Sequence, residues 1–351
     1  MKTNMIVCEN KFASYKSRDI VSINLQNSKG NSISLVNLGA RINKFLVKRK
    51  DGKFDNIILG YDNLEDMLKA RSYFYGASIG RVGGRISKAS FNLGNKNYKL
   101  DNNDGKNHLH GGKNGYDLKI WDYKIKSEKN YAKVIFSLKD KSLDKNYYPG
   151  NIDIKIIHSF NENDEWTIEY EYKTDQTTIA NPTNHVYFNL NGNNSRNILN
   201  HELKIKSNFY VSVDKEGIPV SIKRVENTPY DFNNFKKIGD IVNVNHDEII
   251  NNKGLDNPFI LNKISNQIVL KNSSNKRKII LNTERPAVVI YTHGKVGEKI
   301  KVSGNDINPY SGIALETQYL PDSINRKDFN DIIIKPGKIY KSKTKYSFKE
   351  Y

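Results

Sequence analysis

The sequence predicts an all-β protein, a large antiparallel β-sandwich with few short helices. Short runs of alternating polar and apolar residues recur along the chain, and they are rich in Ile, Val, Tyr, Phe and Thr. Such residues suit a pleated, half-buried surface. Turn signals separate the runs, among them NG at Asn191–Gly192 and PG at Pro336–Gly337. Helical periodicity is nearly absent, and many strands with few helices are typical of a sandwich or barrel.

The expected elements can be placed in chain order. The one clear helix candidate is Asn63–Lys69, with the length of about two turns. No repeat or Pro/Gly-rich linker divides the 351 residues, so we expect a single domain over residues 1–351. The strands that stand out most are Asp19–Leu25, Ser32–Val36, Lys133–Leu138, Ile152–Phe160, Trp166–Tyr172, Glu202–Ile205, Gln267–Leu270, Lys278–Leu281 and Ala287–Tyr291.

The composition limits the partners and the compartment. The formal net charge of +18 raises the possibility of a polyanionic partner such as nucleic acid. However, the cations are mostly scattered lysines, and the densest patch, Asn275–Lys278, is short. Together with the abundant Asn and Ile, they are typical of an AT-biased coding sequence, so we expect no nucleic-acid partner. A single cysteine, no secretory signal and no apolar run of membrane-spanning length favour a cytoplasmic protein without membrane contact.

Two glycine-rich segments are candidate binding loops. Gly76–Ile86 (GASIGRVGGRI) interleaves four glycines with Arg81 and Arg85, either of which could offer a forked donor to a ligand. The alternative is a tight chain passage that needs glycine. In NHLHGG, His108 and His110 would share one face of a strand, which leaves open a metal site or hydrogen bonding to a sugar.

Three further segments carry titratable groups at strand-like positions. In ANPTNHVYFNL, an extended chain places His185, Tyr187 and Asn189 on one face. Taken alone, His185 is more simply a packed structural histidine. Asp256 in GLDNPF would by itself indicate a turn. Glu316 in ALETQYLPDSIN follows apolar residues, and burial there would raise its pKa toward that of a useful base.

Together and in this order, these segments resemble the aldose 1-epimerase (galactose mutarotase) family. The resemblance rests on GRVGGRI, NHLHGG, NPTNHVYFNL, GLDNPF and ALETQYLPDSIN, with NLGARINKFLVKRKDG near the start, and it covers nearly the whole chain. It implies a β-sandwich of the galactose-mutarotase type with a sugar cleft. It also implies an enzyme that interconverts the α and β anomers of free aldohexoses such as D-galactose and D-glucose.

The resemblance also implies roles for single residues. By motif match, Glu316 is the base at the anomeric hydroxyl and His185 is the acid at the ring oxygen. An ordinary histidine pKa of ~6.5 would leave both protonation states of His185 accessible. Arg85, His110 and Asp256 would hold the sugar. The reaction requires no cofactor and no metal, and we expect a monomer or homodimer with a small sugar as its substrate.

Two positions depart from the family pattern. Gly84 stands where many members have Asn, and Arg285 stands at the usual Gln position, where it would be a further substrate-binding residue. A guanidinium only donates hydrogen bonds, so Arg285 raises the alternative of an anionic sugar, such as a hexose phosphate. A non-catalytic sugar-binding module and a retaining glycosidase are two further candidate functions. The glycosidase would require two carboxylates rather than a carboxylate and a histidine.

Overall fold

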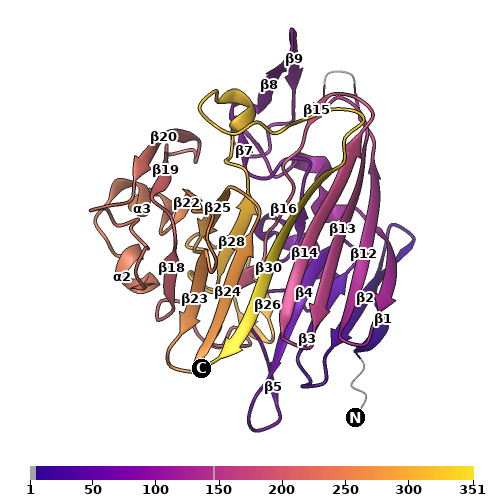
Figure 1. Ribbon diagram of the computed structural model, residues 1–351, viewed down its shortest axis with the longest axis vertical. Helices are drawn as coiled ribbons and strands as arrows, with labels where there is room; N and C mark the ends of the chain where they lie inside the picture. Colours follow the sequence, from indigo (N-terminus) through magenta and orange to yellow (C-terminus); the bar gives the residue numbers. More distant parts are fainter. Residues whose placement is uncertain (1–4, 145–146) are drawn as a thin grey trace.

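A nine-stranded antiparallel sheet runs across the molecule (Figure 1). The computed structural model describes residues 5–144 and 147–351, so six residues of the expected 1–351 domain lie outside it. In spatial order the sheet contains β11 (Asp122–Ser127), β12 (Tyr131–Asp140), β13 (Ile152–Asn161), β14 (Glu165–Thr174), β30 (Tyr340–Glu350), β24 (Arg277–Thr283), β23 (Ile268–Asn272), β18 (Glu202–Ile205) and β21 (Lys236–Lys237).

Two further sheets pack with it around a common core. The six-stranded sheet contains β17 (Tyr187–Phe188), β28 (Ile313–Gln318), β25 (Ala287–Tyr291), β22 (Asp256–Ile260), β19 (Phe209–Val213) and β20 (Pro219–Arg224). The five-stranded sheet contains β1 (Ile6–Tyr15), β2 (Arg18–Gln26), β3 (Ser32–Val36), β4 (Arg41–Lys48) and β5 (Phe54–Asn56). All strand pairings in the three sheets are antiparallel.

Short elements fill the connections. The small strands are β6 (Ser78–Ile79), β7 (Arg85–Ile86), β8 (Ser90–Leu93), β9 (Lys96–Lys99), β10 (His108–Leu109), β15 (Thr178–Ile179), β16 (Thr183–Asn184), β26 (Lys301–Val302), β27 (Asn305–Asp306) and β29 (Ile333–Ile334). The α-helices of the described chain are α1 (Leu64–Lys69), α2 (Ile238–Val242) and α3 (Asp247–Asn252). Single 3-10 turns lie at Arg71–Tyr73, Ser87–Ala89, Gly112–Asn114, Tyr116–Leu118 and Ser323–Asn325.

Large aromatic side chains join the layers of the core. On β14, Trp166 faces inward and stacks on Tyr346 of β30, with ring centroids 4.4 Å apart. Phe188 of the six-stranded sheet lies 5.5 Å from the same tyrosine ring. Phe45 of the five-stranded sheet packs on Phe348 at 6.2 Å. All five side chains are buried, so the sheets are held together chiefly by the removal of apolar surface from water.

The expected fold class is confirmed: strands make up 46% of the chain and helices 9%. The predicted helix is also confirmed, because Asn63 caps α1 by accepting a hydrogen bond from the Asp66 backbone N–H at 2.8 Å. Helices α2 and α3 were not predicted. No helix in the described part of the chain is both long enough and apolar enough to cross a membrane.

Candidate active site

The face of the six-stranded sheet that points away from the nine-stranded sheet forms the floor of a small pocket. Along β28, Leu315 and Thr317 face the core, and the Thr317 hydroxyl hydrogen-bonds with Thr344 of β30 at 2.7 Å. Because side chains alternate along a strand, Glu316 and Gln318 face the opposite way, into the pocket.

Loops that cross this face build the pocket walls. The pocket has a volume of about 30 Å³. Glu316 lies on its floor, directly opposite Val289 of β25 in the strand register. The residues that line the pocket are Gly84, Arg85, Leu109, His110, Val213, Gly217, Asp256, Pro258, Val289, Glu316, Gln318 and Pro321.

His185 and Glu316 form a buried pair at this site. His185 lies between β16 and β17, and its backbone N–H donates to the Ala77 carbonyl at 2.9 Å. Its Nε2 lies 3.3 Å from Oε1 of Glu316. The His185 ring is also packed against the rings of His110 and Phe74, at 5.1 Å and 5.8 Å. The structure therefore brings together the two residues that the motifs assigned to proton transfer.

Burial shifts the pKa values of this pair in opposite directions. It lowers the pKa of His185 to about 3, so the expectation of an ordinary histidine pKa was wrong. Burial also raises the pKa of Glu316 well above its usual value, with a further contribution from the charge of Asp256, and this direction was predicted. Both shifts favour the neutral form of each group, because a low dielectric disfavours charge, and this corresponds to one shared proton located on Glu316.

Arg85 is flanked by two carboxylates. Its Nε donates to Oδ2 of Asp104 at 2.7 Å, and its Nη1 lies 3.7 Å from Oδ2 of Asp256. Burial opposes the guanidinium charge, but these carboxylates outweigh it and raise the pKa of Arg85. Burial raises the pKa of Asp256, with Arg85 opposing that shift. The site therefore offers donors and acceptors side by side, as recognition of sugar hydroxyls requires.

His110 is restricted to one hydrogen-bonding role by the backbone. The Gly84 N–H donates to Nδ1 of His110 at 3.2 Å, and burial lowers the pKa of this histidine well below its usual value. A neutral imidazole that accepts at Nδ1 carries its proton on Nε2. His110 can therefore donate a hydrogen bond from Nε2 into the pocket.

The same tautomer bears on metal binding. Ligand atoms of His110, His185 and Glu316 lie within 4.8 Å of one another, and two histidines with one carboxylate are a known zinc donor set. However, a metal on Nε2 of His110 would require a proton on Nδ1, facing the Gly84 N–H. Two donors would then oppose each other, so this set does not fit a resident zinc ion.

Two expectations for the glycine-rich segments were not met, one for the histidines of NHLHGG and one for the first arginine of GRVGGRI. His108 and His110 do not share a strand face, because β10 ends at Leu109 and His110 has a φ of 53°. His108 instead hydrogen-bonds the Asp101 carbonyl at 2.8 Å, away from a shared metal site. Nε of Arg81, the first arginine of GRVGGRI, lies 2.9 Å from Oδ2 of Asp140 in β12. Of the two arginines in this segment, only Arg85 lines the pocket.

Arg285 is not brought to this pocket. Its Nη2 donates to the Pro182 carbonyl at 3.3 Å, and its guanidinium lies over the rings of Tyr319 and Tyr170, at 5.3 Å and 5.8 Å. Its Nε is buried without a hydrogen-bond partner among the described residues. Arg285 is thus packed near the start of the TNHVYFNL segment and is not one of the residues that line this pocket.

The motifs did not single out Gln318 or Asp104, although both belong to the site. The amide oxygen and nitrogen of Gln318 are buried without hydrogen-bond partners in the described chain, which leaves them available to a ligand. Its spacing of two from Glu316 on a strand could have identified it. Asp104 gave no such signal, because it resembles an ordinary turn residue. Asn189, expected on the polar face with His185, instead donates to backbone carbonyls of Ser311 and Arg196.

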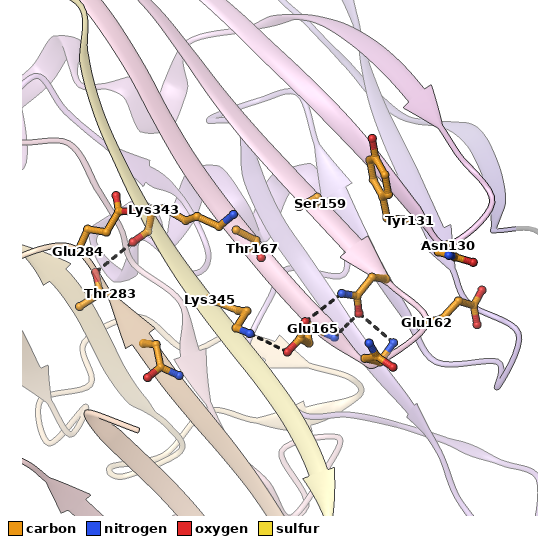
Figure 2. Close-up of a pocket in the computed structure, with 13 residues that line it drawn as sticks. Asn130, Tyr131, Ser159, Glu162, Glu165, Thr167, Thr283, Glu284, Lys343 and Lys345 are labelled. Carbon is orange, nitrogen blue, oxygen red and sulfur yellow. Dashed lines mark hydrogen bonds and ion pairs between the residues drawn. The ribbon is translucent and has the colours of Figure 1, made fainter. Parts of the chain in front are cut away.

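A larger groove of about 760 Å³ lies on the outer face of the nine-stranded sheet and contains none of these residues (Figure 2). Its charged side chains pair across neighbouring strands: Nζ of Lys345 lies 2.9 Å from Oε1 of Glu165, and Oε2 of Glu165 accepts a hydrogen bond from Asn161. Thr167 and Ser159 line the same stretch. Such cross-strand pairs are typical of a solvated sheet face.

The sandwich carries a buried histidine–carboxylate pair beside hydrogen-bond donors and acceptors, an arrangement suited to an enzyme that transfers protons. The family model for aldose 1-epimerase matches residues 21–347. Aldose 1-epimerase of Streptococcus thermophilus is 33% identical over 332 residues, 92% of each chain, and galactose mutarotase of Bos taurus is 32% identical over 90% of each chain. The galactose 1-epimerase structure from Lactobacillus acidophilus superposes with a TM-score of 0.88 at 32% identity, covering 99% of both chains. The chain belongs to the aldose 1-epimerase family.

Proposed function

We propose that this enzyme is a mutarotase that interconverts the α and β anomers of free aldohexoses such as D-galactose and D-glucose. The names of its relatives, aldose 1-epimerase and galactose mutarotase, support this activity. The single observation that carries the proposal is the buried pair of His185 Nε2 and Glu316 Oε1, 3.3 Å apart at the pocket.

Mutarotation requires one base and one acid that act on neighbouring atoms. The anomeric hydroxyl loses a proton while the ring oxygen gains one, and both oxygens are attached to the same carbon. A base and an acid a few ångströms apart can therefore reach both. The ring opens, the aldehyde carbon turns about its bond to C2, and the ring closes on the other face of the carbonyl.

The shared proton of the pair gives a complete cycle. Moving that proton from Glu316 to His185 creates the carboxylate and the imidazolium. The carboxylate then takes the proton of the anomeric hydroxyl, and the imidazolium gives its proton to the ring oxygen. This step leaves the neutral pair beside the open-chain sugar, and closure reverses both transfers. No proton is gained or lost over the cycle, and each group contributes ~10²–10⁴-fold.

The charges around the pocket favour a neutral sugar over a hexose phosphate. The carboxylates of Asp104 and Asp256 lie within ion-pair range of Arg85, the one guanidinium of the described residues that lines the pocket, while Glu316 is neutral when it holds the shared proton. A phosphate dianion would be repelled by these two carboxylates, which already compensate the charge of Arg85. We propose that Arg85 and His110 donate to sugar oxygens and that Asp256 accepts from sugar hydroxyls.

Polarimetry of freshly dissolved α-D-galactose and α-D-glucose tests the proposal. We expect the wild type to accelerate the approach to anomeric equilibrium and to act more weakly on glucose 6-phosphate. Glu316→Gln and His185→Asn should each reduce the rate ~10²–10⁴-fold without changing the circular dichroism spectrum. Glu169→Gln removes a carboxylate from the outer face of the nine-stranded sheet and should keep the wild-type rate.

Two results would contradict these assignments. A wild type that does not accelerate mutarotation would overturn the proposed function. Wild-type rates in either site variant would leave the function standing and remove that residue from the proton-transfer step.

A further inference from the structure

The guanidinium of Arg85 is held on one side by Asp104. The Nε–Oδ2 distance is 2.7 Å, which is a short, charge-assisted hydrogen bond. Its Nη1 lies 3.7 Å from Asp256, within ion-pair range but beyond hydrogen-bonding distance. Among the hydrogen bonds of the described residues, neither terminal nitrogen of Arg85 donates to a protein acceptor, so both remain available in the pocket.

We propose that Asp104 is a positioning residue for sugar binding, which holds Arg85 away from Asp256 so that both groups stay free to bind sugar hydroxyls. The inference rests on the proposed function, because it assigns a purpose to the geometry of that same pocket. Asp104 need not touch the sugar, since it acts through the orientation of Arg85.

The loop that carries Asp104 is fixed enough for this role. The backbone N–H of Asn107 donates to the Asp104 carbonyl at 2.9 Å, and the Asp104 N–H donates to the Asn107 carbonyl at 3.2 Å. The buried Asn107 side chain accepts from the Lys88 N–H at 3.0 Å and donates to Glu216 at 3.0 Å. The loop is therefore tied both to the chain after β7 and to the turn between β19 and β20.

That turn closes the other side of the guanidinium. Gly217 has a φ of +75°, and a Cβ at this position would lie 2.5 Å from Nη1 of Arg85. Glu216 of the same turn pairs with Lys106 at 2.9 Å. Arg85 thus lies between the Asp104 carboxylate and the backbone of the turn at Gly217. The hydrogen bond to Asp104 determines the direction in which the two terminal nitrogens of Arg85 point.

Loss of the Asp104 carboxylate would change the balance of charge around Arg85. Among the described residues, Asp256 would then be the one carboxylate within ion-pair range of the guanidinium, and a shift of roughly 0.5 Å would bring the two groups into hydrogen-bonding distance. A sugar would then have to displace a protein ion pair before it could bind. This change would weaken sugar binding and leave the rate of proton transfer unchanged, because the His185–Glu316 pair does not contact Asp104.

Steady-state kinetics and calorimetry with D-galactose test whether loss of Asp104 weakens sugar binding without slowing proton transfer. Asp104→Ala should raise KM about tenfold while kcat stays within about twofold, and the calorimetric Kd should rise with KM. Asp104→Asn keeps an acceptor for Nε without the charge and should lie between wild type and Asp104→Ala. Asp51→Ala removes a comparably exposed aspartate from its 2.8 Å pair with Arg49, and it should leave both constants unchanged.

The outcomes separate this inference from the proposed function. If the wild type is active and Asp104→Ala keeps the wild-type KM and Kd, the positioning role is wrong and the mutarotase proposal stands. If the wild type binds galactose without catalysing mutarotation, weaker binding by Asp104→Ala still supports the role of Asp104. Failure of the wild type to bind galactose overturns both, and an equal fall in kcat and kcat/KM with unchanged KM overturns the positioning role.

Discussion

At the scale of single residues, burial of the His185–Glu316 pair determines which protonation states the enzyme can use. The pKa of His185 is lowered to about 3 and that of Glu316 is raised by the same loss of solvent. The pair gains a second proton only as the pH falls toward about 3, and it loses its single proton only above the raised pKa of Glu316. Between these limits the one-proton state that the proposed cycle requires persists.

The buried pair predicts the pH profile of kcat/KM. We expect activity above the spontaneous rate to show no break near pH ~6.5, the value of an unperturbed histidine. A decline should occur only on the alkaline side, where Glu316 loses the shared proton. Polarimetric rates from about pH 5 upward, corrected for the buffer-catalysed reaction, check this expectation. A loss of activity centred near pH ~6.5 would show instead that His185 titrates as a solvated acid.

Candidate site residues could be located from the sequence only where a motif contained them. Glu316, His185, Arg85, His110 and Asp256 were located in this way, and the structure brings them to one place. The pKa of His185 depends on neighbours from other elements, which a single strand does not reveal. The same limit explains why the motifs missed the contact of Asp104 with Arg85 and the packed position of Arg285. Both depend on residues from distant segments of the chain, which no local sequence pattern encodes.

At the scale of elements, local patterns were informative for strands and weak for short helices. The predicted runs Ser32–Val36, Glu202–Ile205 and Ala287–Tyr291 coincide with β3, β18 and β25. The first two alternate polar and apolar residues, and the third is a short apolar run rich in β-branched residues, so each pattern is visible within five residues. Helices α2 and α3 contain five and six residues. A helix of that length completes fewer than two turns, so its 3.6-residue period gives only a weak signal in the sequence.

The turn between β19 and β20 gives an element-scale prediction. Gly217→Ala should raise KM about tenfold or more, because the new Cβ would displace a guanidinium whose hydrogen bonds are worth ~1.5–3 kcal/mol each. Backbone strain at positive φ should also lower stability by about 1–2 kcal/mol. Gly337→Ala has the same strain at φ +77° with nothing within 4 Å of its Cβ. Kinetics and urea unfolding of both variants check this, and equal KM values would contradict the steric argument.

At the scale of the whole molecule, the outer face of the nine-stranded sheet intersperses lysines with acidic residues. Lysines there pair with glutamates on neighbouring strands, as Lys345 does with Glu165 and Lys341 with Glu171, each at 2.9 Å. Alternating signs of this kind do not build the continuous positive surface that a polyanion would require. This arrangement agrees with the explanation from codon composition, and the absence of a nucleic-acid partner stays a prediction.

The core also contains histidines that are neutral when folded. His158 is fully buried, donates from Nε2 to the Ala40 carbonyl at 3.2 Å and accepts from the indole N–H of Trp166 at 3.1 Å. Both ring nitrogens are therefore satisfied in the neutral form, and burial lowers the pKa of His158 to about 3. The unfolded chain would protonate this residue near pH ~6.5.

Acid should therefore destabilise the fold through His158. The contribution of His158 to the free energy of unfolding is fully present above pH ~6.5. It falls by about 1.4 kcal/mol per pH unit toward pH 3, because the unfolded state binds the extra proton. His158→Gln should cost ~1–2 kcal/mol at pH 7 through weakened hydrogen bonds, yet its stability should fall less steeply below pH ~6. Other buried histidines titrate in both proteins, so the difference between two urea-unfolding series isolates His158. Parallel pH dependences would show that His158 is already protonated, or solvated, in the folded enzyme.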